Sequence, residues 1–254
     1  MRKIRFLGTG TSTGVPTIGC TCEVCTSTDS RDNRLRTSVL YSDDDTRILL
    51  DCGPDFRQQV LNLPFKALSA VLISHEHYDH VSGLDDLRSF SRFGNIPIYA
   101  EKYTADHLRE RMPYCFIDAS YPGVPKLTLN DVEDLTPFEV ANTHVTPLRI
   151  MHGKLPILGY KVGDNFAYIT DMLTMPDSEV EKLCDLKVLV VNALRLAPHN
   201  THQSLSEALE FVSRIKAEKT YFIHMSHDIG LHKEIEKTLP SGVEFAYDGL
   251  EVIF

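Results

Sequence analysis

The stretch HEHYDH at residues 75–80 follows the apolar run AVLIS at residues 70–74. It offers imidazoles and carboxylates, and both groups are ligands that divalent first-row metals prefer. The short apolar run is rich in β-branched residues and is typical of a buried strand that ends in a polar loop. His75 and His77 then project to the same side of an extended chain, and the last two residues of the stretch lie where the spacing of residues 84–90 predicts a helix. The stretch therefore predicts two pairs of ligands for two neighbouring metal ions.

Two simpler interpretations of residues 75–80 account less well for the number and type of possible ligands. A solvent-exposed loop rarely concentrates this many ligand types directly after a buried strand. A single structural metal is satisfied by about four ligands, and this stretch alone offers more than that. A pair of metals would in turn require further ligands from elsewhere in the chain.

Length and composition indicate an ordinary globular protein. The chain has 254 residues, of which 43% are hydrophobic and 24% charged, enough for one large domain or two small ones. No apolar run approaches the ~20 residues that would span a bilayer. The amino-terminal strand reaches Gly8 too soon to provide the apolar core of a signal peptide. We therefore expect a cytoplasmic protein with no membrane partner.

The formal net charge of −9 argues against a long nucleic acid as partner, because such binding depends on neutralisation of phosphates by Lys and Arg. The charge does not exclude a small anionic substrate, since bound metal ions are often the largest local charges in a site. The oligomeric state lies beyond the sequence, and a homodimer stays open.

A second group of ligand types is the cysteine cluster of Cys20, Cys22 and Cys25. Three thiolates this close together suit a tetrahedral zinc site that lacks its fourth ligand. Disulfide pairing would need an oxidising compartment and would leave one thiol over, and a chance group of buried thiols does not fit the polar residues between them. We therefore expect a structural zinc. The other cysteines are isolated, which predicts core packing: Cys52, Cys115 and Cys184.

Four predicted strands each finish in a residue that can bind a metal. They end at His75, His152, Asp171 and His224. Because strand ends are rigid platforms, several that end together would place these side chains around one point. A lone histidine at a strand end is more often a hydrogen-bonded structural residue, but coincidence is a poor account of four such ends in one chain.

Two further segments carry local predictions. Ser204 and Glu207 form the sequence signature of a capping box at the start of an amphipathic helix. The segment 112–124 contains two prolines and a glycine, and it predicts a loop that could cover a site.

The sequence resembles a known family. HEHYDH matches the H-x-H-x-D-H signature of the metallo-β-lactamase fold superfamily, and the later His, Asp and His follow in the family's order. The closer resemblance is to the PhnP-like group, that of the cyclic phosphodiesterase of the phosphonate-degrading carbon–phosphorus lyase pathway. Stretches along essentially the whole chain carry it: Gly19-Cys20-x-Cys22-x-x-Cys25, His80-Val81-x-Gly83-Leu84, His152-x-Lys154-Leu155 with Gly159-Tyr160, His224-x-Ser226-His227, and Pro240-Ser241-Gly242 with Asp248-Gly249-x-Glu251.

The resemblance implies an α/β (α+β) fold, namely a four-layer αββα sandwich in which two mixed sheets are flanked by helices. It implies a single hydrolase domain over residues 1–254, with a zinc-pinned loop at about residues 9–36. It also implies the ligand sets of three metals. One metal would be held by His75, His77 and His152, a second by Asp79, His80 and His224 with Asp171 bridging the two, and a structural zinc by Cys20, Cys22, Cys25 and His227.

The resemblance also assigns the chemistry. His202 matches the general acid of the phosphodiesterase group, and Asp79 and Asp171 count as catalytic through the metals that they would hold. His202 precedes a predicted helix, whose positive dipole end would lower its pKa, and an ordinary loop histidine is the alternative. A hydroxide bridging two metals, Mn²⁺ or Zn²⁺, would attack a small cyclic phosphodiester of the phosphoribosyl 1,2-cyclic phosphate or 2′,3′-cyclic nucleotide type.

Other functions are ranked lower. The chain departs from the closer relative at Asn192–Arg195, where a Ser-His-Pro run is expected, so the organic part of the substrate stays open. A tRNA 3′-processing endonuclease of the same superfamily usually carries an inserted RNA-gripping arm, for which the short segment between His152 and Asp171 leaves little room. A thioester or lactone hydrolase stays open because the same metals polarise carbonyls. We rank a non-catalytic metal-binding module last, because such a module would not require the general acid that His202 matches.

Overall fold

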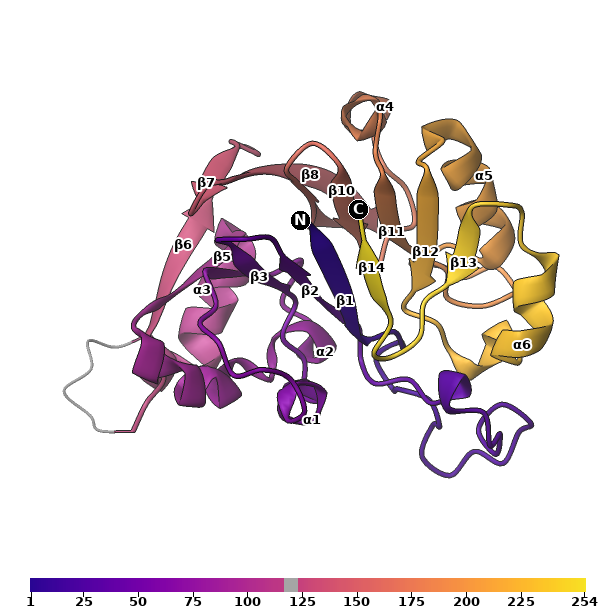
Figure 1. The fold of residues 1–254 in the computed structure, drawn as a ribbon, viewed down its shortest axis with the longest axis horizontal. Coiled ribbons are helices and arrows are strands. Elements are labelled where there is room, and N and C mark those ends of the chain that lie inside the picture. Colours follow the sequence, from indigo (N-terminus) through magenta and orange to yellow (C-terminus); the bar gives the residue numbers. More distant parts are fainter. Residues whose placement is uncertain (117–122) are drawn as a thin grey trace.

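The computed structural model describes residues 1–116 and 123–254, and within them the strands form two mixed sheets of seven strands each (Figure 1). The first sheet has the order β14-β1-β2-β3-β4-β5-β6, antiparallel from β14 to β3 and parallel from β3 to β6. Its strands are β1 (Lys3–Gly8), β2 (Ser38–Ser42), β3 (Arg47–Leu50), β4 (Ala70–Leu72), β5 (Ile96–Glu101), β6 (Leu127–Val132) and β14 (Glu251–Ile253).

The second sheet has the order β13-β12-β11-β10-β9-β8-β7. Its pairing is antiparallel from β7 to β10 and parallel from β10 to β13. Its strands are β7 (Phe138–Val140), β8 (Thr143–His152), β9 (Leu155–Val162), β10 (Phe166–Ile169), β11 (Val188–Asn192), β12 (Lys219–Ile223) and β13 (Val243–Phe245).

Helices cover the outer faces of the two sheets (Figure 1). The α-helices are α1 (Phe56–Val60), α2 (Tyr78–Val81), α3 (Lys102–Arg111), α4 (Asp177–Val180), α5 (Leu205–Ile215) and α6 (His232–Ile235). The 3₁₀ helices are η1 (Ser30–Asp32), η2 (Leu84–Phe93), η3 (Pro113–Cys115), η4 (Glu181–Leu183), η5 (His227–Ile229) and η6 (Glu236–Thr238).

Three hydrophobic cores separate four layers. The first core lies between the sheets and contains the buried rings of Phe6, Tyr41, Tyr160 and Phe166. The second joins the outer face of the second sheet to α5, and the third joins the outer face of the first sheet to α1, η2 and α3. The predicted αββα sandwich with two mixed sheets is therefore confirmed.

The ends of the described chain lie side by side, because β1 pairs with β14 in antiparallel register (Figure 1). Lys3 is opposite Ile253, and Arg5 is opposite Glu251. The amino-terminal strand is thus held on one side by residues from the other end of the chain.

The helix predicted after residues 75–80 takes a different form. A short α2 is followed by the 3₁₀ helix η2, in which Leu84, Leu87 and Phe90 are buried. A spacing of three residues matches the three residues per turn of a 3₁₀ helix, so the same apolar residues still face the core. Of the loop predicted at 112–124, residues 117–122 lie outside the described part. Among the described residues, no helix combines the length and apolar character that crossing a membrane would require.

The capping box predicted at the start of α5 is present. The Ser204 hydroxyl accepts a hydrogen bond from the Glu207 amide, and the Glu207 carboxylate accepts one from the Ser204 amide at 2.8 Å. This reciprocal pair satisfies two of the free amides at the helix start.

The long segment between β1 and β2 is fixed by buried polar contacts to the far end of the chain. Arg34 is 3% exposed, and its Nη1 donates to Thr9 Oγ1 at 3.0 Å and to the Ala246 carbonyl at 2.8 Å. Its Nη2 lies 3.0 Å from Nδ1 of His232, and the His232 amide donates to Asp32 at 2.7 Å. The segment therefore lies against α6 (Figure 1), because α6 begins at His232.

Candidate active site

The predicted donors of both sheets meet at one end of the sandwich. In the second sheet His152 ends β8, His224 directly follows β12, and Asp171 lies just beyond β10. In the first sheet His75 lies just beyond β4. The remaining donors come from α2 and its amino-terminal cap: His77, Asp79 and His80.

The structure brings all of these donors within reach of shared points. In each of four overlapping groups, one ligand atom per residue lies within 4.8 Å of the others. The groups are His75, His77 and His152; His75, His80 and Asp171; Asp79, His80 and His224; and His152, Asp171 and His202. Because the groups share members, they describe one continuous cluster with places for two neighbouring cations.

Three residues of this region have a backbone conformation that is unusual for residues other than glycine. The φ angles are 58° at Asp51, 56° at Asp171 and 57° at His224. Left-handed backbone costs free energy in residues with a Cβ and is concentrated at functional sites. The chain therefore turns sharply where three strands end, and these turns direct the side chains into the cluster.

Two carboxylates lie between two histidines at the centre of the cluster. Nε2 of His80 is 3.1 Å from Asp79 and 3.3 Å from Asp171, and Nε2 of His224 is 3.4 Å and 3.2 Å from the same two carboxylates. Burial would raise the pKa of both carboxyl groups, but the imidazoles outweigh it and hold each pKa below its usual range. Both groups are therefore ionised, which is the form that binds cations.

Asp51 directly follows β3 and is not among the predicted site residues. It lies behind His80 and His75 and orients their rings. Its Oδ2 lies 2.7 Å from Nδ1 of His80 and accepts a hydrogen bond from the Tyr168 hydroxyl at 2.8 Å. Both its oxygens accept from Ser74, whose hydroxyl is 3.0 Å from Nδ1 of His75. A carboxylate behind a histidine in this way fixes the ring and raises its basicity.

The free nitrogens of these rings test whether the cluster fits metal ions. Nε2 of His75 is buried and has no hydrogen-bond partner among the described residues, and Nε2 of His80 is buried beside the carboxylates of Asp79 and Asp171 without hydrogen-bond geometry to either. Buried polar nitrogens without partners are rare and costly. A metal on Nε2, with Nδ1 held by Ser74 or Asp51, accounts for both nitrogens of each ring.

We expect Asp51→Asn to weaken metal binding by about 10–100-fold, because the amide keeps the shape of the side chain but not the charge behind His80. Titration with Mn²⁺ or Zn²⁺ against a competing chelator measures the change. Asp55→Asn is the matched control, since Asp55 pairs with Arg36 at 3.2 Å rather than with a histidine of the cluster. Equal affinities for Asp51→Asn and the parent protein would contradict the orienting role.

His202 lies at the edge of the cluster. Its Nε2 is 2.9 Å from Oδ1 of Asp171, and its Nδ1 is 2.9 Å from the Thr201 hydroxyl and 3.1 Å from Nδ1 of His199. Burial lowers the pKa of His202, although Asp171 opposes this effect. The predicted general acid is therefore placed beside the cluster, with its ring held from both sides.

The three sulfurs of the cysteine cluster lie close to His227, which is their predicted fourth ligand. Nδ1 of His227 is 3.3 Å from the sulfurs of Cys20 and Cys22 and 3.6 Å from that of Cys25. Hydrogen bonds from the Cys25 amide and from His227 lower the pKa of Cys22 to about 6, whereas burial raises the pKa of Cys25 to about 11. His227 lies one short turn after His224, so the same turn contributes one histidine to the donor cluster and one to the cysteine cluster.

The segment Asn192–Arg195, where the sequence departs from the expected pattern, runs beside His202. The Asn192 side chain accepts from the Met172 amide at 2.7 Å and donates to the Met172 carbonyl at 3.0 Å. The Leu194 amide donates to the Gln203 carbonyl at 3.0 Å. Asn192 therefore braces the backbone next to Asp171, while the rest of the segment borders the site.

Comparison with known proteins gives matches over most of the chain. Residues 46–225 match the family described as the beta-lactamase superfamily domain. An octanoyltransferase from Porphyromonas gingivalis is 47% identical over 250 residues, which cover 98% of this chain and 51% of that protein. A coenzyme PQQ synthesis protein B from Xanthomonas oryzae is 26% identical over 169 residues, or 61% of this chain and 54% of the relative. The chain thus spans about half the length of these curated relatives.

Among solved structures, a new diphosphatase from the PhnP family has a TM-score of 0.92 and 38% sequence identity, over 100% of this chain and 98% of that one. A zinc-bound PqqB from Methylobacterium extorquens has a TM-score of 0.81 and 20% identity over 99% of this chain and all of that one. At that identity the second match speaks for the fold alone.

Proposed function

Because the chain belongs to the beta-lactamase superfamily and, within it, to the PhnP family of metal-dependent hydrolases, we propose that it hydrolyses small cyclic or nucleotide-like phosphodiesters. One observation supports this proposal most: the donor cluster and the ring of His202 share the carboxylate of Asp171. A proton donor is thus placed beside a site suited to cations and to an anionic substrate.

The donor set fits two divalent cations. His75, His77 and His152 would hold one, and Asp79, His80 and His224 the other, with Asp171 in reach of both groups. Bound there, the cations would supply Lewis-acid charge that neutralises the phosphodiester oxygens and lowers the pKa of water towards neutrality. Imidazole and carboxylate ligands suit Mn²⁺ as well as Zn²⁺.

The protein's own contribution to the reaction is a positioned proton. Asp171 and Thr201 hold the ring of His202 in place from its two nitrogens. Burial lowers the pKa of this ring, but an anionic phosphodiester bound beside it would favour the protonated form. His202 would then give the proton of Nε2, the nitrogen that faces Asp171 and the cluster, to the leaving alkoxide oxygen as the P–O bond breaks.

We expect His202→Gln to slow hydrolysis of a 2′,3′-cyclic nucleotide by about 10²–10⁴-fold, because the alkoxide would then leave without a proton donor. A 4-nitrophenyl phosphodiester, whose leaving group needs no proton, should lose far less. Steady-state kinetics on both substrates with elemental analysis of the same samples measures this. His144→Gln is the control, since exposed His144 contacts Glu139 instead of the cluster. Equal losses on the two substrates would remove His202 as general acid.

A thioester hydrolase is the second candidate, and the match to an octanoyltransferase favours it. Two metals polarise a carbonyl as well as a phosphoryl oxygen. However, the matched segment is only 51% of that relative, so its name need not describe the shared part. Turnover of octanoyl thioesters, without turnover of cyclic phosphodiesters, would favour this candidate. Cleavage of precursor tRNA would instead favour the endonuclease, which the net charge of −9 disfavours.

We also propose a structural zinc held by Cys20, Cys22, Cys25 and His227. The mutual proximity of their ligand atoms supports it. A zinc ion there would tie the segment between β1 and β2 to the turn that follows His224, next to the active site.

A further inference from the structure

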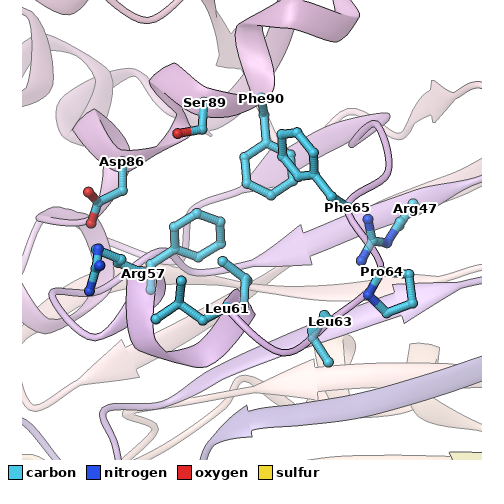
Figure 2. Close-up of a pocket in the computed structure, with 11 residues that line it drawn as sticks. Arg47, Arg57, Leu61, Leu63, Pro64, Phe65, Asp86, Ser89 and Phe90 are labelled. Carbon is cyan, nitrogen blue, oxygen red and sulfur yellow. The ribbon is translucent and has the colours of Figure 1, made fainter.

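A pocket with a cavity volume of about 370 Å³ lies on the outer helical layer, between α1 and η2. This size and its mixed lining are typical of small-molecule sites. Figure 2 shows Arg57 and Asp86 at one end of the pocket and Arg47 beside Phe65 at the other. Its lining, which includes no residue of the donor cluster, contains Arg47, Arg57, Leu61, Phe65, Ser89 and Phe90.

The walls between the two ends are apolar and partly uncovered. The ring of Phe65 packs edge-on against Phe90, with 4.9 Å between centroids, yet Phe65 remains 47% exposed. Leu61 is 60% exposed on the α1 side. Apolar surface held open to water in a concave site gains free energy when an alkyl group covers it.

Arginines surround these walls, although the protein as a whole has a net charge of −9. Arg47 and Arg57 line the pocket, and the Arg92 guanidinium lies 5.9 Å from the centre of the Phe65 ring. In the part of the chain that the structure describes, none of the three forms an ion pair. The acidic residue of the lining, Asp86, is at the same end of the pocket as Arg57, whereas Arg47 is at the opposite end (Figure 2).

Arg47 is the best-placed group to bind an anion. It is only partly exposed, and its Nη1 donates to the Lys66 carbonyl at 2.8 Å, which fixes the guanidinium. A guanidinium presents several planar donors that match a carboxylate, and the remaining donors of Arg47 are available for one.

We propose that this pocket binds a medium-chain fatty-acid carboxylate. The unbranched chain lies between Phe65 and Phe90 on one side and Leu61 on the other, and the carboxylate contacts Arg47. An alkyl chain is favoured because apolar side chains lie between Arg47 and the opposite end of the pocket (Figure 2). The pocket is separate from the donor cluster, so this proposal does not depend on the hydrolase function.

Calorimetric titration of the metal-loaded protein with hexanoate, octanoate, decanoate and 1-decanol tests the proposal. Affinity should rise about fourfold with each added methylene, because each one buries further apolar surface. Decanol has the same chain without the charge and should bind more weakly than decanoate.

Three variants locate the ligand. Arg47→Gln should weaken decanoate about tenfold or more and leave 1-decanol nearly unchanged, because only the charged contact is lost. Arg57→Gln is the matched control at the opposite end and should have a smaller effect. Ser89→Phe should fill the pocket and abolish binding of both ligands, with a thermal melt to show that the variant is folded.

Four results would overturn the proposal. These are absence of saturable decanoate binding, an affinity that does not depend on chain length, equal losses of acid and alcohol in Arg47→Gln, and a larger loss in Arg57→Gln than in Arg47→Gln. Binding of an acidic amphipathic peptide in place of decanoate would make the pocket a protein docking site and would also refute it.

Discussion

Asp171→Asn should reduce turnover of a cyclic phosphodiester by about 10³-fold or more and lower the metal content of the protein. The Asp171 carboxylate is 3.3 Å from His80 and 3.2 Å from His224, and it also belongs to a group with His75. Removing its charge therefore weakens both proposed metal positions at once, and several kcal/mol of charge stabilisation corresponds to a loss of this size. Asn is chosen over Ala because it tolerates the φ of 56° better.

Elemental analysis and steady-state kinetics on the same samples measure this effect. Cys22→Ser is the matched control, because it changes a ligand of the cysteine cluster only. The Cys22→Ser variant should lose one zinc per chain, while the donor cluster should keep its metals. If Asp171→Asn retained both its metals and its turnover, the carboxylate would not belong to the active site.

Arg34→Met should lower the free energy of unfolding by about 3–5 kcal/mol, the usual cost of breaking a buried charged network. Arg34 is 3% exposed, and this burial lowers its pKa to about 10. The variant would leave the Ala246 carbonyl and Nδ1 of His232 without the donor that Arg34 provides. Met has a similar length, so the loss reports on the hydrogen bonds more than on a cavity.

Urea denaturation of both Arg34→Met and Arg36→Met gives the comparison. Arg36 pairs with Asp55 at 3.2 Å, but its side chain is 30% exposed. A partly exposed pair of this kind contributes less than a fully buried network, so Arg36→Met should cost less than Arg34→Met. A loss in Arg34→Met no larger than that in the control would show that the buried contacts do not hold the segment in place.

The resemblance to a known family was sufficient to predict the four-layer fold, and the sequence pattern itself indicated residues that gather at the donor cluster. The donors are few in type and stand at strand ends, so their local pattern reveals them even though they lie far apart along the chain. Asp51 directly follows β3, and this place at the end of a strand is the signal that could have identified it. Its role, however, depends on Tyr168 from the other sheet, and no local pattern contains that contact.

The remaining features arise from packing between distant segments. Arg34 reads as an ordinary charged residue, and only the fold surrounds it with Thr9, Ala246 and His232. The pocket likewise needs α1 and η2 to lie side by side. The 3₁₀ form of η2 could have been predicted from the sequence, because the three-residue spacing of Leu84, Leu87 and Phe90 fits a 3₁₀ helix at least as well as an α-helix.

The pairing of β1 with β14 has a consequence for synthesis on the ribosome. Lys3 and Glu251 are 248 positions apart, so β1 emerges long before the partner that covers its outer edge. An uncovered strand edge can pair with other chains during that interval. A circular permutant of residues 1–254 that joins β14 to β1 and opens at a surface loop would deliver the two strands together, and we expect it to aggregate less during translation.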